Sequence, residues 1–220
     1  MKHRLVIAID GPSGAGKSTA GRALAGRLGY VFLDTGAMYR ALGLKALRRG
    51  LSLDDGRGLT ELARVTRIEL VDGGRGVRLD GENVTDLIRT QEVGGAASRL
   101  SVHTGVRREM VARQRELGQG GGVVLDGRDI GTAVFPSADV KFYVDAEPAR
   151  RAIRRAEELT AGGAATDAAV IEREIRERDQ LDMTRPDSPL TRAPDAVHLD
   201  TTNLTPEEVL ERMLAVVGAK

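Results

Sequence analysis

Short apolar runs alternate with longer amphipathic stretches along most of the chain. The runs are compact and rich in branched side chains, as in strands that are buried on both faces of a parallel sheet. They occupy residues 4–10, 30–33, 122–125, 140–144 and 196–199. Helical spacing of apolar residues marks the stretches 19–28, 37–49 and 148–159. Strands that alternate with helices predict βαβ units and therefore an α/β fold with three layers.

Three shorter segments interrupt this alternation and lie close together in the sequence. They are residues 67–70, 76–79 and 82–84. Turn-forming sequences, Asp72-Gly73-Gly74 and Asp80-Gly81, separate them. This spacing predicts a small antiparallel meander inserted into the α/β frame.

A Gly- and Ala-rich segment at residues 161–165 lies between an Arg-rich helical stretch and another charged one. Its composition predicts the tip of a mobile lid, with Gly162 and Gly163 as candidate hinges. The 220 residues contain neither an internal repeat nor a domain linker, so we expect a single domain, 1–220.

The composition excludes several classes of protein. A hydrophobic content of 41% with 30% charged residues is ordinary for a globular domain. The net charge is only +1, whereas proteins that bind nucleic acids or anionic membranes usually carry a large basic excess. The absence of Cys excludes disulfides and thiolate metal sites. No apolar run is as long as a membrane span, and the N-terminus does not resemble a signal peptide, so we expect a cytoplasmic protein.

A complete G-x-x-x-x-G-K-[ST] motif follows the first predicted strand. It consists of Gly11, Pro12, Ser13, Gly14, Ala15, Gly16, Lys17 and Ser18, with Thr19 next in the chain. The glycines let successive N–H groups point at an anion, and the helix that follows adds its positive end. Lys17 is expected to reach the β- and γ-phosphates of ATP, and the Ser18 hydroxyl to bind Mg²⁺. A chance match is the alternative, but the strand before the motif and the helix after it favour a P-loop.

Among P-loop proteins, the chain fits a small-molecule kinase best. Regulatory GTPases recognise guanine with an N-K-x-D motif, and neither Asn83 nor Asn203 lies in one. A motor or helicase would need a longer chain and an acidic residue that positions Mg²⁺ and water on a later strand. The short chain, the predicted meander and the predicted lid all favour a kinase.

The segment 34–40, after the second predicted strand, has a hydroxyl at Thr35, then Gly36, and Arg40 at the head of a helix, which makes a plausible phosphate-binding turn. Further charged residues follow a later strand and lie on one late helix. Arg128 and Asp129 follow the third predicted strand, where ligands of α/β proteins bind. Arg178, Asp182 and Arg185 have spacings of four and three, which place them on one face of a helix that ends before Pro186. Taken alone, this pattern is more typical of a solvated surface with a Glu174–Arg178 pair.

Several segments together resemble the bacterial cytidylate kinases, which phosphorylate CMP and dCMP. They are IDGPSGAGKST (9–19), LDTGAMYRALG (33–43), IRTQEV (88–93), LDGRDIGTAVFP (125–136), ERDQLDMTR (177–185), SPL (188–190) and LDTTNLTPEEV (199–209). Many enzymes share the P-loop, whereas D-T-G-A-M-Y-R, D-G-R-D-I-G-T and R-D-x-x-D-x-x-R in this order are far more specific.

The resemblance implies a fold and a set of domain boundaries. The fold is a P-loop sandwich whose five parallel strands have the order 2-3-1-4-5. The core is formed by residues 1–66 and 102–220, an insert of about 67–101 covers the monophosphate, and a lid of about 150–168 carries Arg151, Arg154 and Arg155.

The resemblance also implies roles for individual residues. The CMP phosphate would be held by Arg40, Arg128 and Arg185. The cytosine would contact Ser98, Arg107 and Asp129, with Thr35 and Tyr39 lining the same pocket. The ribose hydroxyls would contact Arg178 and Asp182.

The expected chemistry needs no general base, because the acceptor phosphate is a dianion above its second pKa of about 6. Catalysis would then consist of positioning and charge neutralisation by Lys17, Arg128, Arg185, Arg154 and Mg²⁺. The expected ligands are ATP and CMP or dCMP, with no nucleic acid and no membrane, and the protein is expected to be a monomer. The alternatives are a kinase for UMP, dTMP, AMP or shikimate, and a regulator that binds ATP without transferring phosphate.

Overall fold

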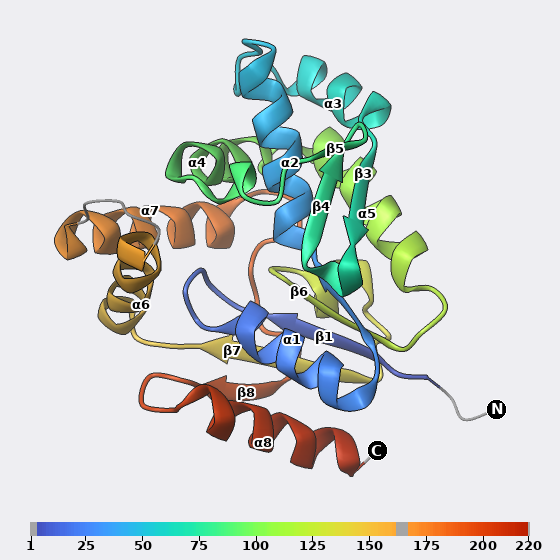
Figure 1. Ribbon diagram of the computed structural model, residues 1–220, viewed down its shortest axis with the longest axis vertical. Helices are drawn as coiled ribbons and strands as arrows, with labels where there is room; N and C mark the ends of the chain where they lie inside the picture. Colours follow the sequence, from blue (N-terminus) through green and yellow to red (C-terminus); the bar gives the residue numbers. More distant parts are fainter. Residues whose placement is uncertain (1–3, 162–166, 220) are drawn as a thin grey trace.

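A five-stranded parallel sheet forms the centre of the protein, as the computed structural model of residues 4–161 and 167–219 shows (Figure 1). Its strands are β1 (Val6–Asp10), β2 (Val31–Asp34), β6 (Val123–Gly127), β7 (Val140–Asp145) and β8 (Val197–Asp200). They lie in the order β2-β6-β1-β7-β8, and all neighbouring strands are parallel. Numbered along the chain, this order is 2-3-1-4-5, so the predicted sheet is confirmed.

Helices cover both faces of the sheet and form the outer layers. On one face, α1 (Lys17–Leu28) and α8 (Pro206–Gly218) pack through residues such as Leu24 and Met213 against Ile9 and Phe142. On the other face, α2 (Thr35–Arg48), α5 (Thr104–Gly118) and the short π-helix η3 (Ile130–Val134) lie near β6 and β1. Because helices cover both faces of the sheet, the alternate residues of its central strands are apolar on both faces.

The predicted meander forms a second, antiparallel sheet. It contains β3 (Ile68–Val71), β4 (Gly76–Leu79) and β5 (Glu82–Asn83), in the order β3-β4-β5. The 3-10 turns η1 (Asp72–Gly74) and η2 (Leu87–Arg89) and the helices α3 (Gly56–Val65) and α4 (Gln91–Leu100) lie beside it in the chain. The division into a core, an insert of 67–101 and a lid of 150–168 stays a prediction.

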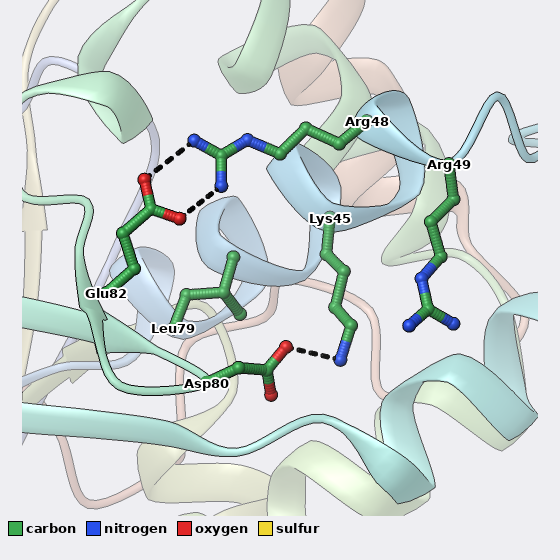
Figure 2. A pocket seen from close by; sticks show the side chains of 6 residues that line it. All are labelled: Lys45, Arg48, Arg49, Leu79, Asp80 and Glu82. Carbon is green, nitrogen blue, oxygen red and sulfur yellow. Dashed lines mark hydrogen bonds and ion pairs between the residues drawn. The ribbon is translucent and has the colours of Figure 1, made fainter.

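Helix α2 joins this sheet to the central parallel sheet. Its Ala37 and Ala41 are buried in one apolar cluster with Val77 and Val84 of the meander region. Two ion pairs add to this contact at the far end of α2, around a shallow pocket (Figure 2). Lys45 lies 2.6 Å from Asp80, and Arg48 donates to both carboxylate oxygens of Glu82, at 2.6 and 2.9 Å. Both pairs lie at the end of α2 opposite Thr35, away from the predicted phosphate-binding residues at the start of this helix.

Helix α6 (Pro148–Ala161) lies in the segment predicted to form a lid, and α7 (Ala168–Thr184) follows it. They pack on each other through Ala152 of α6 and Ile171 and Ile175 of α7. Helix α7 ends at Thr184 because the residue before a proline is driven out of the helical region, and Arg185 has φ −58° and ψ 141°. The predicted hinge at Gly162 and Gly163 lies outside the described residues. No helix in the described part of the chain is long and apolar enough to cross a membrane.

Candidate active site

The P-loop curls between β1 and α1, and its glycines are required by its shape. Gly11 has φ 146°, and a Cβ there would lie 1.9 Å from the Val144 carbonyl oxygen. Lys17 begins α1, and its Nζ donates to the Pro12 carbonyl at 2.6 Å. Burial, and next the neighbouring Arg128, lower the pKa of Lys17 to about 7. The loop therefore holds a lysine that would gain from the arrival of an anion.

Ser18 is linked to a carboxylate that we did not single out from the sequence. Its Oγ donates to Asp126, which lies at the carboxyl end of β6 and pairs in register with Asp34 of β2. Burial, and next the charge of Asp34, raise the pKa of Asp126 to about 6 against the opposing effects of Lys17 and the Ser18 hydrogen bond. The Oδ1 atom of Asp126 is buried and has no hydrogen-bond partner among the described residues. The sequence signal was available, since Asp126 is the first acid of the D-G-R-D segment that follows β6.

These residues fit a magnesium ion that is bound together with ATP. Mg²⁺ prefers oxygen ligands and in kinases is usually held by one or two protein groups and by substrate phosphates. The Ser18 hydroxyl and the Asp126 carboxylate are adjacent oxygens of this kind beside the P-loop. No cluster of three or more His, Cys, Asp or Glu side chains that could hold a metal ion occurs among the described residues.

Behind the P-loop, a chain of buried ion pairs joins three separate elements. Arg107 of α5 donates to Asp129, and Asp129 also lies 3.5 Å from Arg185. Asp182 of α7 lies 3.7 Å from Arg185 and accepts from Arg128 Nε at 2.7 Å. We call these five residues the ion-pair chain. The structure thus gathers the predicted acceptor-site residues of α5, of the turn after β6 and of the end of α7.

The burial of this cluster decides between the two interpretations of α7. Asp182 and Arg185 are each only 5% exposed, so this face of the helix is not a solvated surface. Glu174 accepts a hydrogen bond from the Gln91 side chain, at 2.5 Å. Burial alone would raise the pKa of Asp182, but Arg128 and Arg178 hold it below its ordinary value. Burial, and next Arg128, lower the pKa of Arg178 to about 10.

Other predicted acceptor residues surround this chain. Thr35 donates to the Asp126 carbonyl at 2.7 Å, and Arg40 donates to Asp34 at 3.0 Å. The Ser98 hydroxyl is buried and has no hydrogen-bond partner among the described residues, so it can serve a ligand. Burial raises the pKa of Tyr39 to about 12, which keeps its phenol neutral.

Two arginines of the predicted lid make contacts that could not be predicted from the sequence. Arg151 donates to the Ser13 carbonyl of the P-loop at 3.0 Å and to Asp179 of α7 at 2.6 Å. Arg154 donates to the hydroxyl and the carbonyl of Thr201, at 3.1 and 2.5 Å. The structure therefore does not bring Arg154 together with the ion-pair chain; it holds this predicted catalytic residue at the loop after β8.

Comparison with known proteins identifies relatives over the whole chain. The family model for cytidylate kinase matches residues 7–219. The cytidylate kinase of Geobacillus kaustophilus is 50% identical over 222 residues, which cover 100% of this chain and 99% of that protein. The cytidylate kinase of Solibacter usitatus is 49% identical over 221 residues, with 100% and 94% covered.

Solved structures with low sequence identity share the fold. A shikimate kinase from Acinetobacter baumannii has a TM-score of 0.51 at 18% identity, covering 100% of this chain and 96% of the other. A gluconokinase from Sinorhizobium meliloti has a TM-score of 0.52 at 16% identity, covering 100% and 94%. The arrangement of strands and helices is thus that of P-loop kinases.

Proposed function

Because the chain belongs to the cytidylate kinase family and is a nucleoside monophosphate kinase that phosphorylates CMP, we propose that the P-loop binds Mg-ATP and that the ion-pair chain binds CMP. The observation that carries this proposal is a set of three arginines paired with Asp129 and Asp182, in which Arg107 and Arg185 are buried and Arg128 is half-buried. The charges of Arg128 and Asp182 act on Lys17 of the P-loop. A protein that only sensed ATP would have no use for a second buried cationic site. The same site would accept dCMP.

The roles of the acceptor residues follow from their chemistry. The phosphate dianion would be bound by Arg40, Arg128 and Arg185, since guanidinium groups match phosphate oxygens with paired donors. The Asp129 carboxylate can accept from the amino group of cytosine, while Arg107 and Ser98 can donate to its ring acceptors. Arg178 and Asp182 would contact the ribose, and Thr35 and Tyr39 would shape the wall of the pocket.

The transfer itself would need no general base. The CMP phosphate attacks as a dianion, since its second pKa is about 6. The rings of the two described histidines are engaged elsewhere: that of His103 contacts the Leu53 carbonyl at 2.9 Å, and that of His198 lies beside Tyr143 with ring centres 6.0 Å apart. Catalysis would consist of bringing two anions together and neutralising the charge that develops between them.

Lys17, Arg128 and Arg185 would provide most of this neutralisation from the protein. Bound at Ser18 and Asp126, Mg²⁺ would add positive charge at the ATP phosphates. Arg154 is the further candidate, and it would have to leave Thr201 to reach the transferred group. We also propose that the enzyme acts as a monomer in the cytoplasm, where ATP and CMP are available, without nucleic acid or membrane.

A coupled assay of ADP release tests the acceptor. CMP, dCMP, UMP, AMP, GMP, dTMP and shikimate are compared with a control without acceptor. We expect strong turnover with CMP and dCMP and little turnover without acceptor. Turnover with only one of the other acceptors would overturn the assignment of cytosine, and equal ADP release without acceptor would overturn phosphoryl transfer to a nucleotide.

The variant Asp129→Asn tests the base contact. Asn keeps the shape of the side chain but replaces one acceptor oxygen by a donor and removes the charge that pairs with Arg107 and Arg185. We expect the KM for CMP to rise about tenfold or more, because a charged hydrogen bond is lost, and the preference for CMP over UMP to fall. Complete loss of turnover at saturating CMP would instead make Asp129 an essential base.

A further inference from the structure

Asp10 is a buried carboxylate that lies between the P-loop and the acceptor turn. It ends β1, directly before Gly11, and is 4% exposed. Its Oδ1 accepts from the Ile130 N–H and its Oδ2 from the Gly131 N–H, both at 2.7 Å. Both carboxylate oxygens are therefore used on consecutive main-chain donors 120 and 121 residues further along the chain.

These two donors belong to the turn that carries Arg128 and Asp129. The π-helix η3 begins at Ile130, and Asp129 stands in the position before it, where an aspartate commonly accepts from the first N–H groups of a helix. Here the Asp129 side chain makes no such bond and pairs instead with Arg107 and Arg185. Asp10 takes over these N–H groups, and this leaves the Asp129 carboxylate available to the acceptor site.

The surroundings of Asp10 are fitted to this contact. A Cβ at Gly131 would lie 3.3 Å from Asp10 Oδ2 and 3.1 Å from Lys141 Cδ, so the glycine gives the carboxylate room. Burial, with a smaller contribution from the charge of Asp129, raises the pKa of Asp10 to about 6 although the two N–H groups and Lys17 oppose the shift. A carboxylate with so little access to water is costly unless it is hydrogen-bonded, and these N–H groups satisfy it.

We propose that Asp10 is a positioning residue for the acceptor: its carboxylate holds the main chain of residues 129–131 so that Arg128 and Asp129 face CMP. The inference rests on the roles proposed above for these two residues. Asp10 does not touch the substrate in this arrangement and acts through the turn. Its position directly before the P-loop also ties the acceptor turn to the strand that presents the ATP phosphates.

The test compares Asp10→Asn with a matched control, Asp139→Asn. Asp139 also accepts from a main-chain N–H, that of Val6 at 2.7 Å, but at the opposite end of β1. In Asp10→Asn, an amide donor would face a main-chain donor, so the turn must shift. We expect the KM for CMP to rise about tenfold or more, the preference for CMP over UMP to fall, and the KM for ATP to change less than about twofold. Asp139→Asn should leave all three unchanged, even if its Tm falls as much.

A purely structural role for Asp10 predicts a different result. Both variants would then lose Tm and keep the KM for CMP of the parent enzyme, which would overturn the inference. If Asp10→Asn does not fold, Gly131→Ala disturbs the same contact from the other side. It should raise the KM for CMP by about threefold or more, with a smaller change in the KM for ATP, and an unchanged KM for CMP would overturn the inference as well.

Two further variants separate this inference from the proposed function. Arg128→Ala and Asp129→Ala remove the groups that would contact CMP directly. If neither changes the KM for CMP, the proposed acceptor site is wrong. If both raise it and Asp10→Asn does not, the acceptor site stands and the role of Asp10 is wrong.

Discussion

The P-loop and the ion-pair chain are both suited to bind phosphate, but the first relies on main-chain groups and the second on side chains. The P-loop is one contiguous segment whose main-chain N–H groups are suited to bind an anion, and Lys17 is its ionisable side chain. The ion-pair chain uses side chains from α5, the turn after β6 and α7, and each cation already faces a carboxylate. The P-loop half of the site depends on backbone shape, and the ion-pair half depends on the pairing of opposite charges.

This difference has consequences for how each half meets its ligand. Lys17 is buried with a lowered pKa, so it gains a charge partner only when phosphate arrives. The arginines of the ion-pair chain keep their charge, and a phosphate would share them with Asp129 and Asp182. We therefore expect a substitution in the P-loop to cause a large loss of activity through one position. A substitution in the ion-pair chain should also alter the interactions of its other members.

The largest effect should come from Lys17→Met. Removing the ammonium group should lower kcat by about 10²–10³-fold, because stabilisation of charge in the transition state is lost. The folded protein should become more stable below pH 7. The pKa of Lys17 is about 7 in the fold and higher when unfolded, so the unfolded chain binds more protons, and this cost of the lysine declines as pH rises from 7 towards 10.5.

Steady-state kinetics and thermal unfolding at pH 6 and pH 9 measure both effects. Arg27→Met in the last turn of α1 is the control, since it removes a cation from the other end of the same helix. A Lys17→Met enzyme with nearly normal kcat, or with a lower Tm at pH 6 than the parent, would contradict the contrast drawn between the two halves.

The second effect concerns a pair within the ion-pair chain. Asp182→Asn leaves Arg128 without its carboxylate and should lower the free energy of unfolding by about 3 kcal/mol, the usual result of breaking a buried pair. The double variant with Arg128→Met should lose less than the sum of the two single changes, because no unpaired charge is left.

The exposed pair Arg48–Glu82 provides the matched comparison (Figure 2). It has two short hydrogen bonds, but water competes for both side chains, so Arg48→Gln and Glu82→Gln should each lower Tm by no more than about 2 °C. Chemical and thermal denaturation of the parent and the five variants, Arg128→Met alone included, measure the difference. Equal losses of stability for the buried and the exposed pair would show that burial does not determine how much an ion pair stabilises the fold.

The contrast also explains which parts of the molecule could be predicted. The strands, the meander and the P-loop depend on patterns within short segments, and the structure confirms them. Helix α2 begins two residues earlier than predicted, at Thr35, because the Asp34 side chain accepts from the Ala37 N–H at 2.8 Å. Such shifts at the ends of elements follow from local capping.

Contacts between distant segments were not predictable in the same way. The link between Ser18 and Asp126 joins residues 108 positions apart, and the bond from Arg154 to Thr201 depends on how α6 is placed against the loop after β8. Neither contact leaves a periodic signal. The resemblance to a family predicted most of the proposed acceptor-site residues. It did not indicate that three arginines and two aspartates form one continuous chain of ion pairs.

The smallest effect is a difference in proton uptake between the two halves. At pH 8, Lys17 with a pKa of about 7 is mostly neutral, so binding of a magnesium complex of a non-hydrolysable ATP analogue should take up about 0.5–1 proton. CMP binding should take up almost none, since the pKa of Arg178 is about 10 and that of Asp182 lies below its ordinary value. Calorimetric titrations in two buffers with different ionisation enthalpies measure the uptake. The uptake with the analogue should vanish in Lys17→Met; equal uptake with both ligands would mean that Lys17 is already charged and that the two halves differ in shape alone.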